Sequence, residues 1–260
     1  MNQPVDVDIL TDLLGPATPW RPIEVVETTG STNEDLMARA GAPHGLVRIA
    51  GHQSAGRGRF DRVWQSAPGA GVAVSVVVRP TQPVERWGWL PLLTGMAVAA
   101  GVRDLGLDAG CDASRVGLKW PNDVLIDDAK ICGVLAQTDG EKVVLGWGLN
   151  IAMTAEELPV PTATSLALAD WPTDATFIVL YVLQRLEQYY AWWGAGHDMV
   201  YDYTELSSTL GRQVRVERAR DTIAGKAVGI SRTGELIVDV DGYGTVAVEA
   251  GDVVHLKDGR

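Results

Sequence analysis

Segment 72–78 is an almost unbroken apolar run, in which Ser75 is the one polar residue. A half-exposed strand alternates apolar and polar side chains, whereas an apolar run of this length is typical of a strand buried on both faces. Pro80 and Pro83 end the run, and a helical apolar pattern follows over 85–106. We therefore predict an α/β fold built around a buried sheet.

Other segments carry the periodic patterns of strands and helices. We predict further strands over 23–27, 47–51, 123–126, 131–137 and 143–148, and helices over 33–40, 85–106 and 174–193. Segment 174–193 is the strongest helix, because its apolar residues form one stripe and Asp174 is a suitable N-cap. Residues 127–130 separate two predicted strands, which indicates a hairpin.

The pattern changes near residue 210. Segments 213–217, 222–230, 235–240 and 245–249 are short strands separated by glycine turns, and they predict a small antiparallel barrel. We divide the chain into an N-terminal segment (1–22), a main domain (23–208) and a C-terminal barrel (209–260). The N-terminal segment has room for one short helix around 8–14, which is too little for a helix-turn-helix module.

Charge and cysteine content limit the classes of function. The chain carries 22 Lys+Arg against 33 Asp+Glu, a formal net charge of −11, which argues against a protein that mainly binds nucleic acid. Segment 1–22 has no signal-peptide pattern, and we expect no apolar run near the roughly 20 residues of a membrane span. Cys111 and Cys132 are too few for a disulfide framework. These features predict a cytoplasmic protein that does not enter a membrane.

Segment 51–64 contains the most informative motif. Its glycines, arginines and tryptophan are Gly56, Arg57, Gly58, Arg59, Arg62 and Trp64. Glycine lets backbone N–H groups approach an anion, and guanidinium groups suit phosphate and carboxylate oxygens. An isolated motif of this kind fits a weak RNA-binding patch equally well. The acidic chain, together with a tryptophan that can stack on adenine, favours a small nucleotide ligand.

A second cluster follows the predicted core helix. Lys119, Asn122, Asp123 and Lys130 lie on the two sides of the predicted hairpin, with Gly133 beyond them. Lysines suit phosphate oxygens, an amide suits a purine edge or a ribose, and a carboxylate suits an attacking amine or Mg²⁺. Taken alone, however, a Pro-Asn-Asp sequence is more often only a turn.

A third cluster, Ser31-Thr32-Asn33, precedes a predicted helix. Either hydroxyl is a suitable N-cap, and the carboxylate three residues later completes a capping box, so a structural role is sufficient. If this segment lines a pocket, its hydroxyls and amide offer donors and acceptors to a polar group such as a urea. Asn150 ends a glycine-containing strand that permits close approach of a ligand.

Together, and in this order, these motifs resemble those of biotin protein ligases. The resemblance rests on Gly-Ser-Thr-Asn33, Gln53-Ser-Ala-Gly-Arg-Gly-Arg59, Lys119-Trp-Pro-Asn-Asp123, Lys130 with Gly133, and Gly-Trp-Gly-Leu-Asn150. It implies a mixed-sheet catalytic domain of the biotin and lipoate ligase type, followed by a small SH3-like β-barrel. It covers residues 24–150 by motif and the remainder by layout.

The resemblance also assigns roles position by position. Biotin would contact Ser31, Thr32, Asn33, Gln53, Gly56, Arg57, Gly58, Arg59, Lys130 and Gly133. ATP would contact Arg59, Arg62, Trp64, Lys119, Asn122, Lys130 and Asn150. Catalysis would depend on Lys130 and Arg59, and Asp123 would orient the acceptor lysine. Mg²⁺ is implied as a cofactor, and its ligands are not assigned.

The reaction that the resemblance implies has two steps. Biotin and ATP first give biotinyl-5′-AMP and pyrophosphate, and the biotinyl group then passes to a lysine with release of AMP. The acceptor would be the biotin carboxyl carrier domain of acyl-CoA or pyruvate carboxylases. Because only about twenty residues precede the first predicted catalytic strand, we expect no DNA binding and no repressor function. We expect a monomer or a weak homodimer.

Two positions depart from the pattern of the family. Phe60-Asp61 stands where many relatives carry a basic or small residue followed by glycine, and Trp147 stands where a small residue is common. Asp61 places a negative charge in a phosphate-binding loop, where we expect it to point away or to pair with Arg59 or Arg62. At an effective dielectric constant of about 20, like charges 4 Å apart repel by about 4 kcal/mol.

We therefore predict that Asp61→Gly lowers the Kd for ATP, because it removes this repulsion. The loop should also be looser before ligand binds than in relatives that have glycine there. Equilibrium binding of ATP to both proteins tests the prediction, and an unchanged or higher Kd in the variant would contradict it.

Two other functions fit parts of the pattern. A lipoate or octanoate ligase or transferase shares the implied fold, but it is not expected to carry both the Gly-Arg-Gly-Arg loop and Lys-Trp-Pro-Asn-Asp. A catalytically silent module would instead bind RNA through the arginine loop. Lys119, Lys130 and Asn150 argue against that module, and salt-dependent RNA binding would support it.

Overall fold

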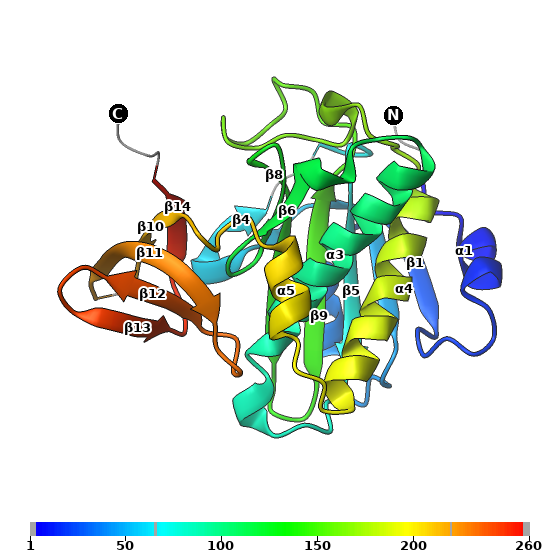
Figure 1. Cartoon of the computed structure of the whole chain (residues 1–260). Coiled ribbons are helices and arrows are strands. Elements are labelled where there is room, and N and C mark those ends of the chain that lie inside the picture. Colours follow the sequence, from blue (N-terminus) through cyan, green and yellow to red (C-terminus); the bar gives the residue numbers. More distant parts are fainter. Residues whose placement is uncertain (1–3, 65–66, 219, 257–260) are drawn as a thin grey trace.

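A computed structural model describes residues 4–64, 67–218 and 220–256, without the side chain of Asp61 (Figure 1). Seven strands form one sheet in the order β1-β2-β5-β9-β8-β7-β6. The strands are β1 (Ile23–Thr29), β2 (Val47–Gln53), β5 (Gly71–Val78), β6 (Val116–Lys119), β7 (Asp123–Ile126), β8 (Ala129–Thr138) and β9 (Val143–Asn150). β1 and β2 are parallel, and every other neighbouring pair is antiparallel. The predicted α/β fold with a mixed sheet is confirmed.

Helices cover both faces of this sheet. α3 (Trp89–Asp108) and α4 (Ala175–Gly194) pack together on one face (Figure 1). α2 (Thr32–Ala38) lies on the other face, where Leu36 packs with Val144 of β9. Leu145 and Trp147 of the same strand belong to the core beneath α3 and α4. Because both faces are covered, every residue of β5 is buried, as its apolar sequence predicts.

The long central helix differs from its prediction at its start. The predicted helix over 85–106 consists of a 3₁₀ turn, η2 (Val84–Arg86), followed by α3. A Cβ at Gly101 would lie 2.8 Å from the backbone nitrogen of Val182, so this glycine permits close packing of α3 on α4. Glycine has a weak helix propensity, and the close contact between α3 and α4 offsets this cost.

Contrary to the sequence-based expectation, one segment is long and apolar enough to cross a membrane. Residues 84–108 meet this criterion by length and composition alone. However, 78% of the 18-residue stretch that meets it is buried inside the protein. The same composition is typical of a core helix, because such a helix faces apolar neighbours on all sides.

The remaining elements are shorter. They are α1 (Val7–Leu14), β3 (Gly56–Arg57), η1 (Arg59–Asp61), β4 (Val63–Trp64), η3 (Ala113–Arg115), η4 (Ala167–Ala169) and α5 (Val200–Leu206). The β7–β8 hairpin is present as predicted, and its turn residues Asp127 and Asp128 have φ values of 50° and 63°. Aspartate tolerates this left-handed conformation, which two-residue hairpin turns require. The sequence patterns missed β6, α5 and β14, which span four to seven residues each.

The C-terminal strands form a separate antiparallel sheet beside the seven-stranded sheet (Figure 1). They are β10 (Gln213–Glu217), β11 (Thr222–Ile230), β12 (Leu236–Val240), β13 (Gly244–Val248) and β14 (Asp252–His255). Two buried tryptophans attach this sheet to the rest of the protein. The indole N–H of Trp89 donates to the carbonyl of Arg232 at 2.8 Å, and that of Trp120 donates to the carbonyl of Gly234 at 3.2 Å.

His255 of β14 lies in this contact region. Its Nε2 is 3.0 Å from Thr209 Oγ1, and its Nδ1 is 3.4 Å from a nitrogen of Arg212. Burial, reinforced by the charges of Arg212 and Lys119, lowers the pKa of His255 to about 4. The native protein therefore holds this imidazole in its neutral form between pH 4 and 7.

We expect His255 to make the protein sensitive to acid. Its pKa in the unfolded chain is about 6.5, so above that pH both states are neutral and this contribution is fully present. As the pH falls from 6.5 to 4, the unfolded state gains a proton that the native state does not. The free energy of unfolding then decreases by roughly 1–2 kcal/mol, after discounting for the partial exposure of the ring. Urea denaturation at pH 7.5 and 5.0 should show a smaller decrease in His255→Gln, and equal decreases would refute this role.

Candidate active site

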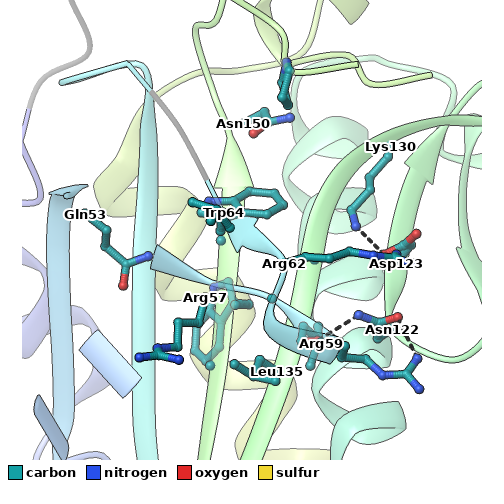
Figure 2. A pocket seen from close by; sticks show the side chains of 18 of the residues that line it. Gln53, Arg57, Arg59, Arg62, Trp64, Asn122, Asp123, Lys130, Leu135 and Asn150 are labelled. Atoms are coloured by element: carbon teal, nitrogen blue, oxygen red, sulfur yellow. Dashed lines mark hydrogen bonds and ion pairs between the residues drawn. The ribbon is translucent and has the colours of Figure 1, made fainter. Parts of the chain in front are cut away.

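A cavity of about 340 Å³ opens between the seven-stranded sheet, the segment 53–64 and the start of β14. Its lining contains every site residue predicted from the sequence except Gly56 and Lys119. The predicted residues that line it are Ser31, Thr32, Asn33, Gln53, Arg57, Gly58, Arg59, Arg62, Trp64, Asn122, Asp123, Lys130, Gly133 and Asn150. Residues from distant parts of the sequence therefore meet in one place (Figure 2).

The two predicted residues outside the lining have other surroundings. Gly56 pairs with Trp64 in the β3–β4 hairpin, and a Cβ on it would lie 2.6 Å from the Trp64 carbonyl oxygen. Its lack of a side chain thus permits this hairpin to close. Lys119 ends β6 opposite Asp123, and its charge acts on His255 of the C-terminal sheet.

One wall of the cavity is neutral and polar. Ser31 is the N-cap of α2, and its Oγ accepts a hydrogen bond from the backbone N–H of Glu34 at 3.4 Å. The Glu34 carboxylate pairs with Arg57, so only half of the predicted capping box is formed. The next residue, Thr32, donates its backbone N–H to Gln53 Oε1 at 2.7 Å. The buried start of α2 is thereby fixed against β2.

Glycines make room for this wall and for the tryptophan of the loop. A Cβ at Gly146 would lie 1.9 Å from Asn33 Oδ1, and one at Gly148 would lie 2.5 Å from the indole nitrogen of Trp64. Because successive residues of a strand face opposite sides, Trp147 between them points into the core, where it is 3% exposed. Trp147 is nevertheless among the residues that line the cavity.

The other end of the cavity is charged. Lys130 of β8 reaches Asp123 of β7, with Nζ 2.5 Å from Oδ1 (Figure 2). The Lys130 ammonium also lies 5.6 Å from the centre of the Trp64 ring, a cation–π distance. Asn150 is held by donation from its Nδ2 to the Thr164 carbonyl at 3.0 Å. A lysine, a carboxylate and an aromatic ring thus meet at one point.

Two arginines complete this end. Arg59 donates to Asn122 Oδ1 at 3.3 Å and to the Gly251 carbonyl at 3.4 Å, and Arg62 pairs with Asp252. Burial lowers the pKa of Arg59, but a guanidinium starts so far above neutrality that it stays charged. The sequence patterns did not identify Asp252, because it lies in the other sheet, about 190 residues further along the chain.

The loop that carries these arginines has an unusual backbone conformation. Phe60 adopts φ 54° and ψ 44°, the left-handed region that favours glycine, and the residue is 61% exposed. The predicted orientation of the Asp61 carboxylate concerns a side chain outside the described part of the structure.

The residues that the structure describes do not form a protein-held metal site. Among residues 4–64, 67–218 and 220–256, no group of three or more His, Cys, Asp or Glu side chains is placed to hold a metal ion. Both carboxylates of the cavity, Asp123 and Asp252, are paired with cations. The donor set therefore does not fit a resident divalent cation.

Comparison with known proteins agrees with the motifs. The model of the biotin/lipoate A/B protein ligase family matches residues 23–150, and that of the biotin protein ligase C-terminal domain matches residues 209–256. A biotin–[acetyl-CoA-carboxylase] ligase of Mycobacterium tuberculosis is 42% identical over 265 residues, covering 99% of this chain and 98% of that protein. The chain belongs to the biotin protein ligase family. It is therefore an enzyme of the ligase class.

Other biotin protein ligases extend the comparison. The bifunctional ligase/repressor BirA of Escherichia coli is 30% identical over 240 residues, which cover 85% of this chain and 70% of that protein. A biotin protein ligase from Aquifex aeolicus, solved in complex with biotin and ATP, superposes with a TM-score of 0.77 at 24% identity, covering 92% of this chain and all of that one. At this identity the superposition establishes the shared fold.

Proposed function

We propose that the chain adenylates biotin with ATP and transfers the biotinyl group to a lysine of a biotin carboxyl carrier domain of acyl-CoA or pyruvate carboxylases. The observation that carries the proposal is that one cavity joins a neutral polar wall at Ser31–Asn33 to a cationic end at Arg59, Arg62 and Lys130. Such a cavity suits a ligand that has a polar ring at one end and a carboxylate at the other. The names of the M. tuberculosis and A. aeolicus relatives support this ligand pair.

In the first step a carboxylate oxygen of biotin attacks the α-phosphorus of ATP, the bond to the bridging oxygen breaks, and pyrophosphate leaves. Negative charge accumulates on the phosphoryl oxygens, where fixed cations stabilise the transition state. We assign that role to Lys130, whose Nζ leaves Asp123 to contact the carboxyl oxygen and the α-phosphate. Arg59 and Arg62 hold the phosphates, and Trp64 with Asn122 and Asn150 contacts the nucleoside.

In the second step the neutral amine of the acceptor lysine attacks the carbonyl carbon of biotinyl-5′-AMP. The bond to the phosphate oxygen breaks, AMP leaves, and the amine nitrogen releases one proton to the solvent. Asp123 lies at the cavity beside Lys130, where its carboxylate can accept a hydrogen bond from the incoming amine. We propose Asp123 as the residue that orients the acceptor. Closure of segment 53–64 over the anhydride would exclude water until the carrier arrives.

We propose that Mg²⁺ enters as the MgATP complex, as part of the substrate. Because the cavity carboxylates already have cationic partners, phosphate oxygens and water supply the ligands of the metal.

Biotin-dependent exchange of labelled pyrophosphate into ATP tests the proposal. Exchange should occur with biotin and should be absent with lipoate and with octanoate. Exchange with lipoate would instead indicate a lipoate or octanoate ligase. If none of the acids supports exchange, the alternative of a catalytically silent RNA-binding module would be favoured. In that case filter binding of RNA at two salt concentrations would decide.

Further features remain proposals. We propose domain limits of 1–22, 23–208 and 209–260, supported by the start of β10 at Gln213 and of the C-terminal family match at residue 209. We also propose a cytoplasmic monomer or weak homodimer that does not repress transcription. Light scattering on a sizing column tests the oligomeric state, and a mobility-shift assay with promoter DNA tests the absence of repression.

A further inference from the structure

A lysine is buried at the end of α2 that lies away from the cavity. Lys142 directly precedes β9, and its side chain is only 4% exposed. Its Nζ donates to the backbone carbonyls of Met37 and Arg39 at 3.1 and 2.8 Å. These carbonyls belong to the end of α2, where carbonyl groups lack partners within the helix. Burial of an ammonium group costs free energy unless it is hydrogen-bonded, and these two bonds offset that cost.

The base of this side chain is fixed by the β8–β9 turn. The Asp139 carboxylate accepts hydrogen bonds from the backbone N–H groups of Glu141 and Lys142, both at 3.0 Å. Thr138 Oγ1 donates to the Lys142 carbonyl at 2.8 Å. The Asp139 carboxylate also lies 3.7 Å from Lys142 Nζ, but its side chain is 41% exposed, so this ion pair is weak. Lys142 therefore connects a well-ordered turn to the end of α2.

The strand β9 contacts α2 along the whole length of the helix. Lys142, Val144 and Gly146 face the same side, because alternate residues of a strand share a face. Lys142 meets the last turn of α2, and Val144 packs with Leu36 in its middle. In the first turn, a Cβ on Gly146 would lie 1.9 Å from Asn33 Oδ1. The first turn thus rests on the strand backbone, while Lys142 ties down the last turn.

The charge of Lys142 suits this end of the helix. Aligned peptide dipoles give the C-terminal end of a helix a partial negative charge, which a cation stabilises. The other ion pair at this end joins Arg39 to Glu24, whose side chains are 40% and 31% exposed, so solvent screens it. Because α2 has only seven residues, about two turns, a displacement of its last turn is transmitted to residues 31–33.

We propose that Lys142 is a positioning residue, which sets the position of α2 along β9 and thereby the affinity of the cavity for biotin. The inference rests on the proposed function, because biotin is the ligand assigned to the wall at residues 31–33. A small displacement of the groups in this wall weakens their hydrogen bonds to a ligand, since these bonds depend steeply on distance and angle. The groups assigned to ATP, such as Arg59 and Asn122, lie on other elements. Lys142 should therefore act on biotin and not on ATP.

The variant Lys142→Met tests the inference. Methionine is similar in volume to lysine, but it cannot donate to the two carbonyls. The Kd for biotin, measured by calorimetric titration without nucleotide, should rise about tenfold. The KM for ATP, measured by pyrophosphate exchange at saturating biotin, should stay within about twofold of the wild-type value. Thermal unfolding checks that the variant is folded, and exchange of a buried charge for an apolar group of similar volume is often neutral for stability.

Further variants separate the cation from its surroundings. Lys142→Arg retains a cation that can donate to two carbonyls, and it should bind biotin at least about threefold more tightly than Lys142→Met. Asp139→Asn removes the exposed carboxylate but keeps the acceptor of the turn, and its Kd for biotin should stay within about twofold of wild type. If Lys142→Met does not fold, Lys142→Gln replaces it. The shorter and neutral amide should raise the Kd for biotin several-fold.

Several results would overturn the inference and leave the proposed function intact. One is an unchanged or lower Kd for biotin in folded Lys142→Met, or in Lys142→Gln where that variant replaces it. Equal losses in the methionine and arginine variants would assign the effect to packing, and a tenfold loss in Asp139→Asn would assign it to the turn. A Kd for biotin and a KM for ATP that rise by the same factor would indicate a general structural role. Failure of the wild-type protein to bind biotin at all would instead remove the proposed function itself.

Discussion

Replacing Lys130 by alanine is expected to lower the rate of biotin-dependent pyrophosphate exchange by about a thousandfold, near the upper end for loss of one group that stabilises charge in a transition state. The Lys130 ammonium stands between the Asp123 carboxylate and the Trp64 ring, at the cationic end of the cavity. No other lysine lines the cavity among the described residues. Labelled pyrophosphate exchange at saturating biotin and ATP measures the effect.

A matched control separates catalysis from folding. Lys226 is exposed on β11, away from the cavity, and Lys226→Ala should retain the full exchange rate. Lys130→Ala leaves Asp123 without its cation, but both side chains are partly exposed, so we expect a loss of only about 1 kcal/mol in the free energy of unfolding. A folded Lys130→Ala protein with more than a tenth of the wild-type rate would exclude the proposed role.

The second large effect is expected at the neutral end of the cavity. Gly146→Ala should raise the Kd for biotin by roughly a hundredfold, because the new Cβ would lie 1.9 Å from Asn33 Oδ1. Overpacking of this kind costs about 1–3 kcal/mol, and 2.7 kcal/mol corresponds to a hundredfold change in affinity. Here the strain must be relieved by moving Asn33, which also breaks its contact with Ser75.

Calorimetric titration of biotin without nucleotide measures this loss. Gly229→Ala in β11 is the matched control, because a Cβ there meets no atom within 4 Å. The control should bind biotin as the wild type does. A change of less than threefold in Gly146→Ala would show that the start of α2 does not bind biotin. Together, the Lys130 and Gly146 variants test the two ends of the cavity independently.

Elements whose signals lie in consecutive residues were predicted well. The apolar run of β5, the stripe of α4 with Asp174 as its N-cap, and the β7–β8 hairpin are all present. The strands β7, β10 and β11 begin and end at the predicted residues. Backbone propensity, capping and side-chain periodicity act over a few residues, so a linear sequence contains them.

The motifs also identified most of the residues that meet in the cavity. Fourteen predicted residues line it because binding groups tend to occur in short clusters at the ends of strands and helices. Lys119 is the informative exception. It belongs to the same motif as Asn122 and Asp123, yet it lies outside the lining and acts on His255.

What the sequence by itself determined is therefore most of the longer strands and helices, the fold class and the motifs that resemble those of biotin protein ligases. Only the tertiary structure decided which face of β9 carries α2, so that Gly146 meets Asn33 while Trp147 enters the core. It alone brought Ser75 behind Thr32, and Asp252 to Arg62. These contacts join strands and sheets that are distant along the chain. They are set by packing between layers, which local periodicity does not encode.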